Sequence, residues 1–225
     1  RSVELAADKS PVVRKFLAAA LDRLPPDSRW DVLAGLTAHP EDVSDHNLPL
    51  LYWYAAEPLV EADPARALAW AGAVAETRLL EFTARRVGTL KNGDAIELLI
   101  AQLGKLDDPA RQLAVLEGVR LSLAGRRRVD MPPSWNAVAS RLAGSDNPAI
   151  REHAESLAVT FGDPAALARV RGEAADRAAD VVARTAAIDT LLAVKDAELP
   201  KLLLELLGDP PMRLAALKGL AAFDE

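Results

Sequence analysis

The chain has 225 residues and a formal net charge of −6; half of its residues are hydrophobic but only 4% are aromatic. The absence of cysteine excludes disulfides, thiolate metal sites, covalently attached c-type haem and a cysteine nucleophile within this chain. The negative net charge disfavours general binding to phosphate backbones, which needs clustered Lys and Arg.

No apolar run approaches the roughly 20 residues that span a bilayer, so we expect no membrane insertion. The chain begins at Arg1 rather than at a methionine, and we therefore expect a piece of a longer protein.

Apolar residues recur at intervals of three or four positions along nearly the whole chain, and Pro or Gly residues interrupt this pattern at short intervals. Such spacing is typical of amphipathic helices, and no alternating run predicts a strand. The predicted helices span residues 11–24, 28–38, 48–61, 64–75, 77–90, 94–105, 109–124, 134–143, 148–161, 164–175, 178–194, 197–207 and 210–222.

Several predicted helix starts resemble one another. Residues 10–14 (SPVVR), 147–151 (NPAIR) and 209–213 (DPPMR) begin with a short polar residue and a proline and end in Arg. The polar residue is expected as N-cap, and proline fits the first helical turn. Residues 180–184 (DVVAR) lack the proline, and residues 108–112 (DPARQ) carry Gln in place of Arg.

The arginines at the fifth position are expected to bond to Asp side chains or to helix ends. These are Arg14, Arg151, Arg184 and Arg213.

The starts at residues 108, 147, 180 and 209 are 39, 33 and 29 positions apart. This is the span of a helix pair, and such a period indicates a stacked repeat. The pattern resembles HEAT repeats, well over 108–222 and loosely over 10–107, and the resemblance implies a ladder of Asp and Arg between neighbouring repeats. We predict an all-α, right-handed α-solenoid of antiparallel helix pairs (HEAT/armadillo-like).

We predict a single helical-repeat domain over residues 1–225. It comprises N-terminal helix pairs with an aromatic cluster (1–124), a long loop (125–133) and C-terminal HEAT-like repeats (134–225). Three arginines in the loop, at 126–128, could form an anion or nucleic-acid patch, but without interleaved aromatic residues we favour a solvated loop.

The most unusual stretch is DHNLPLLYWYAAEPLV, residues 45–60. Asn47 is a plausible cap of the helix 48–61, Pro58 should kink or end that helix, and Asp63 should cap the next one. Trp70 is expected to return towards Tyr52–Tyr54. One face of the helix is expected in the core: Leu48, Leu51, Tyr52, Ala55 and Leu59. The preceding loop, 40–47, could supply polar partners for the buried aromatic residues.

His46 could form a metal site or an acid/base pair with Asp42 and Asp45. Adjacent residues do not converge as i, i+4 ligands do, so we favour a structural role, with partner binding as the alternative.

Trp53 and Tyr54 are either core residues or an exposed interface hot spot, and we favour the core. Glu57 and Glu61 could serve as paired carboxylates of a glycosidase, but one helix offers no cleft between them. We predict no catalytic, metal-binding or cofactor-binding residue and no cofactor. The candidates for contact with a partner are Asp45, His46, Asn47, Trp53, Tyr54 and Glu57.

Residues 38–71 resemble a segment of large proteins of planctomycetes and related bacteria, often called membrane-bound dehydrogenase or haem-binding-domain proteins. The resemblance is carried by residues 45–49 (DHNLP), Tyr52-Trp53, residues 57–59 (EPL) and Asp63-Pro64, and then by residues 79–87 (LLEFTARRV).

In that family a propeller-like dehydrogenase domain precedes HEAT-like helices and a c-type haem domain. The resemblance implies a periplasmic or extracellular location and a redox-linked context. This chain has no Cys-x-x-Cys-His, so the resemblance implies the helical middle piece.

The first hypothesis is therefore a non-catalytic scaffold or protein-interaction module that binds neighbouring domains or another protein. An alternative is a DNA-binding helical-repeat enzyme of the glycosylase type, with Trp53, Trp70 and Asp45 near its groove, although the net charge opposes nucleic-acid binding. A purely structural spacer is the third hypothesis.

Overall fold

The computed structural model describes residues 2–91, 93–126 and 129–223. Over these residues the protein is all-α, with fourteen α-helices, two 3-10 helices and no strand. The α-helices are α1 (Ser2–Ala6), α2 (Pro11–Ala19), α3 (Pro26–Leu36), α4 (Leu48–Val60), α5 (Pro64–Ala73), α6 (Thr77–Gly88), α7 (Ala95–Leu103), α8 (Pro109–Leu123), α9 (Trp135–Ala143), α10 (Pro148–Thr160), α11 (Pro164–Ala175), α12 (Val181–Ala193), α13 (Leu199–Leu206) and α14 (Arg213–Phe223).

The thirteen predicted helices correspond to α2–α14. The short α1 was not predicted, because five residues are too few to show a helical period. The predicted helix 11–24 ends at Ala19 and is followed by a 3-10 helix, Leu21–Arg23. Pro58 does not end α4, which continues to Val60. Pro58 lies on the exposed side, where water can bond to the carbonyl that the proline frees.

Two compact units make up the chain. Unit 1 comprises residues 1–124 and 133–153, and unit 2 comprises residues 125–132 and 154–225. Arg126 belongs to unit 2, whereas Arg127 and Arg128 of the predicted cationic loop lie outside the described residues.

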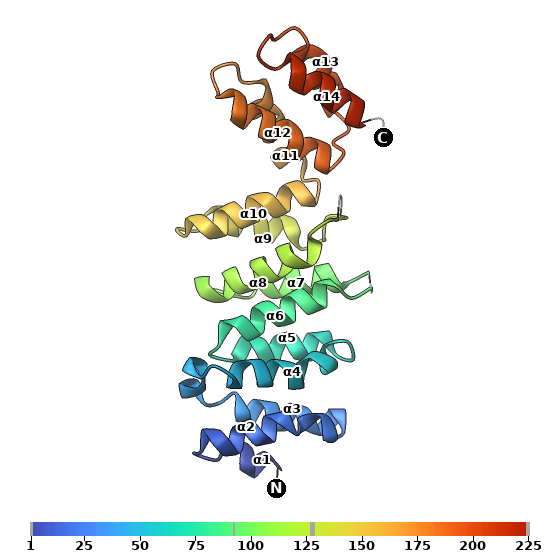
Figure 1. Cartoon of the computed structure of the whole chain (residues 1–225). Coiled ribbons are helices and arrows are strands. Elements are labelled where there is room, and N and C mark those ends of the chain that lie inside the picture. Colours follow the sequence, from blue (N-terminus) through green and yellow to red (C-terminus); the bar gives the residue numbers. More distant parts are fainter. Residues whose placement is uncertain (1, 92, 127–128, 224–225) are drawn as a thin grey trace. The chain divides into compact units, whose positions relative to one another are not determined.

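In unit 1 neighbouring helices along the chain contact each other from α1 to α8, and several helices also contact the next but one. Helices α2, α4, α6 and α8 contact one another in succession, and α5, α7 and α9 do the same. Figure 1 shows the helices of this unit following one another in chain order from α1 to α8. In unit 2 the same pattern joins α11 with α12, α13 with α14, and α12 with α14.

The apolar stripes of these helices form the cores. The predicted core face of α4 is confirmed: Leu48, Tyr52, Ala55 and Leu59 are buried, and Leu51 is partly buried. In unit 2, Ile188 and Leu191 of α12 pack with the leucines of α13.

Helices α6 and α8 approach each other closely at Gly118. A Cβ atom there would lie 2.6 Å from the carbonyl oxygen of Glu81 and 2.7 Å from the Cβ atom of Ala84. Only glycine, which lacks a side chain, therefore permits the two helices to cross so closely.

The predicted caps form in part. Asp63 accepts from the backbone N–H of Arg66 at 2.9 Å, and Asp108 from that of Ala110 at 2.7 Å. Asn47 makes no side-chain cap, contrary to prediction. Asp45 takes this role, because its side chain reaches the N–H groups at the start of α4.

Asp209 was also expected as a cap. Helix α14 instead begins at Arg213, and the buried carboxylate of Asp209 accepts a hydrogen bond from Arg184 at 2.7 Å. Arg184 and Asp209 belong to two successive repeat starts, and this pair therefore has the form of one step of the expected Asp–Arg ladder. A buried guanidinium needs this countercharge more than a helix end needs a cap.

The arginines at the fifth position bond as predicted, mostly to a carbonyl just after the preceding helix. Arg14 donates to the carbonyl of Asp8, Arg151 to that of Ser145, and Arg213 to that of Leu207, each six residues earlier. Gln112 donates to the carbonyl of Leu106 at 2.8 Å, also six residues earlier. The recurring function of this position is thus to satisfy a free carbonyl after the preceding helix.

The aromatic residues do not gather in one cluster as expected. The Trp70 ring packs on Trp30, with centroids 6.3 Å apart, and its Nε1–H donates to Thr37 at 3.2 Å. The Trp53 ring packs on Phe82, at 5.6 Å. Side-chain direction, which sequence spacing does not fix, separates Trp70 from Trp53.

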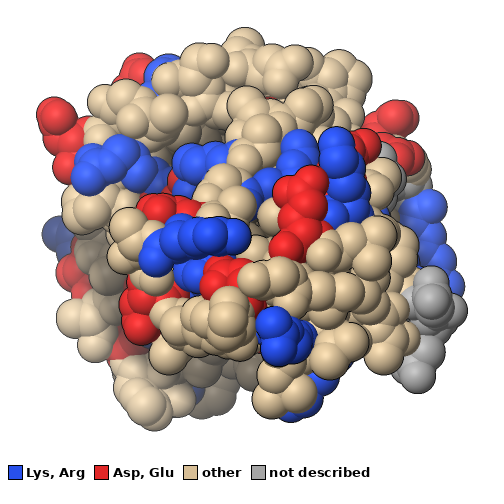
Figure 2. Space-filling model, turned by 90° about the horizontal axis from the view of Figure 1, so that it is seen from above, with Lys and Arg blue, Asp and Glu red and all other residues tan. Residues whose placement is uncertain are grey.

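The face of the molecule in Figure 2 carries Lys and Arg side chains interspersed with Asp and Glu. Over the described residues, no helix is long and apolar enough to cross a membrane.

Candidate functional site

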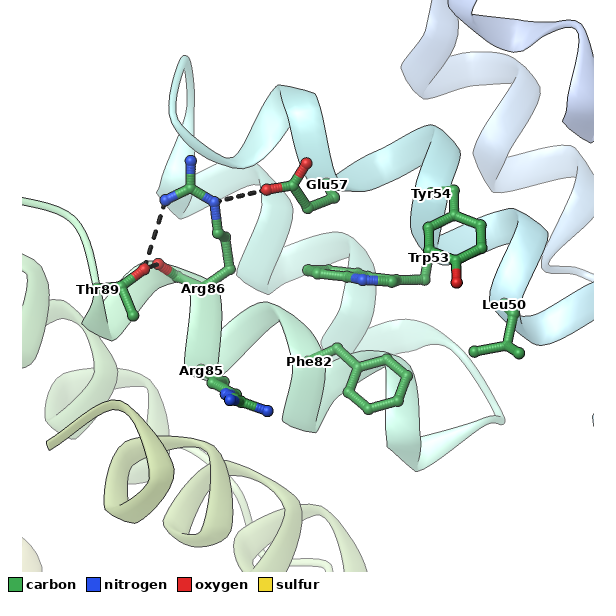
Figure 3. A pocket seen from close by; sticks show the side chains of 8 residues that line it. All are labelled: Leu50, Trp53, Tyr54, Glu57, Phe82, Arg85, Arg86 and Thr89. Atoms are coloured by element: carbon green, nitrogen blue, oxygen red, sulfur yellow. Dashed lines mark hydrogen bonds and ion pairs between the residues drawn. The ribbon is translucent and has the colours of Figure 1, made fainter. Parts of the chain in front are cut away.

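A groove of about 530 Å³ lies between α4 and α6 in unit 1. Its residues recur at helical spacing on the two facing helices, and Figure 3 shows them around the hollow. Helix α4 contributes Leu50, Trp53, Tyr54 and Glu57; α6 contributes Phe82, Arg85 and Arg86, and Thr89 follows directly after its end.

The apolar part of the groove is exposed to solvent. Tyr54 is 65% exposed and Leu50 is 40% exposed, whereas the Trp53 ring is half-buried against Phe82. The expectation that Tyr54 is a core residue is therefore wrong. The opposite face of α4 already fills the core, which leaves Tyr54 and Leu50 on the outside of the helix.

A network of ion pairs closes one end of the groove. Arg86 donates to Glu57 at 2.7 Å and to Glu61 at 3.1 Å, and it also donates to Thr89. Figure 3 shows the contacts of Arg86 with Glu57 and Thr89 as dashed lines. The geometry does not suit the glycosidase alternative, because both carboxylates bind one guanidinium instead of flanking a substrate.

Arg85 differs from its neighbour. It extends away from the ion pair of Arg86 and Glu57 and lies on the side of Phe82 (Figure 3). It is exposed, and among the described residues it makes no side-chain hydrogen bond and no ion pair. Its electrostatic neighbour is Glu81, one turn earlier. Burial and the carboxylate of Glu117 raise the pKa of Glu81, whereas Arg85 lowers it.

The predicted partner-binding residues divide into two groups. Trp53, Tyr54 and Glu57 line the groove. Asp45, His46 and Asn47 do not line it; they precede α4. Asp45 accepts from the N–H groups of Asn47 and Leu48 at 2.7 and 2.9 Å, and these bonds lower its pKa.

His46 is exposed, and its ring makes no hydrogen bond among the described residues. Asp42, its proposed metal or acid/base partner, is instead buried and bonded to two other residues. No group of three or more His, Asp or Glu side chains in the described part of the chain could hold a metal ion.

Asp42 belongs to a buried polar triad with Arg14 and Tyr52. Its carboxylate accepts from Arg14 Nε at 2.8 Å and from the Tyr52 hydroxyl at 2.6 Å, with a further bond from Arg14 Nη2. The loop 40–47 thus supplies a polar partner for a buried tyrosine, as predicted. Burial, and then the bond to Asp42, raise the pKa of Tyr52. Tyr52 therefore stays neutral and donates its proton.

The glycosylase alternative needs Trp53, Trp70 and Asp45 together. Of these only Trp53 lines the groove, because Trp70 bonds to Thr37 and Asp45 caps α4.

The half of the groove that α6 supplies was not predicted from the sequence. Residues 79–87 carry a family resemblance, but no site residue was predicted among them. The adjacent arginines of this segment, one turn after an aromatic residue, were a usable signal, but nothing local shows which helix α6 faces.

Comparison of the chain with models of known protein families, with curated proteins and with solved structures gave no match.

Proposed function

We propose that this chain is a non-catalytic protein-interaction module, and that it binds its partner in the groove between α4 and α6. One observation carries the proposal: two large side chains, Leu50 and Tyr54, stand exposed beside the ring pair of Trp53 and Phe82. Exposed apolar patches of this kind mark interaction sites, and Trp, Tyr and Arg are the side chains enriched in hot spots.

We test this with short random peptides displayed on phage and selected on the full chain. Tyr54→Ser should weaken binding of the selected peptides by at least about tenfold, because a buried hot-spot tyrosine contributes roughly 2 kcal/mol or more. The melting temperature should hardly change, since Tyr54 is exposed and surface substitutions alter stability by about 0.5 kcal/mol or less.

The matched control is Phe16→Ser on α2. Phe16 is 71% exposed, belongs to the same unit and does not line the groove. It should leave peptide binding unchanged. Peptides that bind equally well to the Tyr54→Ser variant, or that lose affinity only with Phe16→Ser, would contradict the proposal.

The solenoid architecture belongs to the same proposal. We infer a right-handed α-solenoid of helix pairs from the recurring contacts between successive pairs within each unit, and from the bond of Arg184 to Asp209. A crystal structure in which the pairs do not stack with a right-handed turn would contradict it.

The resemblance of residues 38–71 supports a parent protein that is exported and redox-linked, in which this chain would position neighbouring domains. Sequencing of the coding DNA on both sides tests this. A Cys-x-x-Cys-His motif should follow, and flanking sequence without a haem motif or a propeller would contradict the assignment.

A further inference from the structure

The charges of the groove indicate what kind of partner fits it; this inference rests on the proposed function above. The groove has two cations and one anion among its lining residues: Arg85, Arg86 and Glu57. Arg86 is already paired with Glu57 and with Glu61. One positive charge, that of Arg85, is therefore left to the groove, in a protein whose overall charge is −6.

Glu81 does not neutralise Arg85 in the way that Glu57 neutralises Arg86. The two residues are one turn apart on α6, but they make no ion pair. Burial and the charge of Glu117 raise the pKa of Glu81 and outweigh the opposite effect of Arg85. A carboxylate from outside could approach Arg85 without breaking an existing ion pair.

The remaining walls suit an apolar side chain. In Figure 3 Phe82 lies next to Arg85, and Trp53 and Leu50 line the groove beyond Phe82. A volume of about 530 Å³ can hold a large side chain and part of its backbone, since pockets for small molecules span roughly 300–1,000 Å³. Binding there would remove water from Arg85 and strengthen its attraction for an anion.

We propose that the groove binds an acidic peptide segment with one apolar anchor residue. The anchor packs between Leu50 and the rings of Trp53 and Phe82, and an adjacent Asp or Glu of the partner pairs with Arg85. Arg86, paired with Glu57 and Glu61, limits the groove at its other end and leaves no unpaired charge there for the partner.

The four tryptophans provide a site-specific readout, because each indole N–H gives its own proton–nitrogen NMR signal. Trp53 lines the groove, whereas Trp30 and Trp70 pack on each other and Trp135 is fully buried. Trp53→Phe assigns the Trp53 signal. The ligand is an acetylated and amidated peptide with a Phe–Leu pair between Glu residues, titrated into the full chain.

We expect this peptide to shift the Trp53 signal most, and the counterpart with Gln in place of each Glu to bind about tenfold more weakly, as for loss of a charge-assisted bond. The Arg85→Gln variant should bind the Glu and Gln peptides equally well. The Arg85→Glu variant should instead prefer a peptide with Lys in place of each Glu. Arg23→Gln is the control, because Arg23 is an exposed cation of the same unit away from the groove.

Equal binding of the Glu and Gln peptides would overturn the charge inference while leaving the groove a protein-binding site. The inference would also be overturned if the Glu peptide did not shift the Trp53 signal, or if the Arg85→Gln variant still preferred the Glu peptide to the Gln peptide. A single-stranded oligonucleotide that shifts Trp53 more strongly than the acidic peptide would show that the partner is a nucleic acid. The phage selection described above decides separately whether the groove binds peptides at all.

Discussion

Asp42→Ala is expected to reduce the free energy of unfolding of unit 1 by about 3–5 kcal/mol. Arg14 is only 1% exposed, and its carboxylate partner Asp42 lies 2.8 Å from its Nε. The substitution leaves a buried guanidinium with the carbonyl of Asp8 and a 3.4 Å contact to the exposed Glu41. It also removes the acceptor of the Tyr52 hydroxyl.

Tryptophan fluorescence during urea denaturation measures this effect. Trp30, Trp53, Trp70 and Trp135 all belong to unit 1, so the signal reports on that unit. The matched control is Asp31→Ala. Asp31 is an exposed aspartate whose ion pair with Arg66 is 4.0 Å long, and its loss should change stability by at most about 1 kcal/mol.

The double variant Arg14→Met/Asp42→Leu distinguishes an unpaired charge from lost packing. Replacing both members of a buried ion pair by apolar side chains is often nearly neutral, so the double variant should be more stable than Asp42→Ala alone. A double variant as unstable as the single one, or a loss below about 1 kcal/mol for Asp42→Ala, would show that the ion pair does not have this role.

Gly118→Ala is expected to destabilise the protein by about 1–3 kcal/mol, as over-packing does. The new methyl group would lie 2.6 Å from the carbonyl oxygen of Glu81 and 2.9 Å from the backbone nitrogen of Arg85. Backbone atoms within a helix cannot move singly, so α8 and α6 must separate. This loss exceeds the gain of up to about 1 kcal/mol that alanine gives over glycine inside a helix.

Gly172→Ala is the matched control, because Gly172 also lies inside a helix but its added Cβ would have no atom within 4 Å. There the helix preference acts alone, and the variant should be more stable by about 0.5–1 kcal/mol. Thermal unfolding followed by circular dichroism measures both variants. The same sign of change at both positions would contradict the close crossing of α6 and α8.

The sequence predicts the local features of the structure better than the non-local ones. The helices α2–α14 were predicted, because apolar period and proline-marked starts are local signals. The buried face of α4 was predicted for the same reason, down to Tyr52 and Leu59. Asp63 was identified as a cap because its bond reaches only three residues ahead.

The errors concern contacts that span many residues. Asp209 has the sequence context of a cap, but it binds Arg184, 25 residues earlier. Trp70 was expected near Tyr52–Tyr54, and it packs on Trp30. In each case two helices had to be placed before the partner could be known.

The residues of the candidate site were likewise predicted where local signals mark them and missed where a second helix is needed. The sequence alone determined an all-α chain with a distinctive aromatic segment and pointed to Trp53, Tyr54 and Glu57. Only the tertiary structure decided that Tyr54 is exposed, that Phe82 and Arg85 face that segment, and that Arg86 is already paired. The physical reason is that a helix and its caps arise from bonds between near neighbours in the chain, whereas a groove arises from how two helices pack.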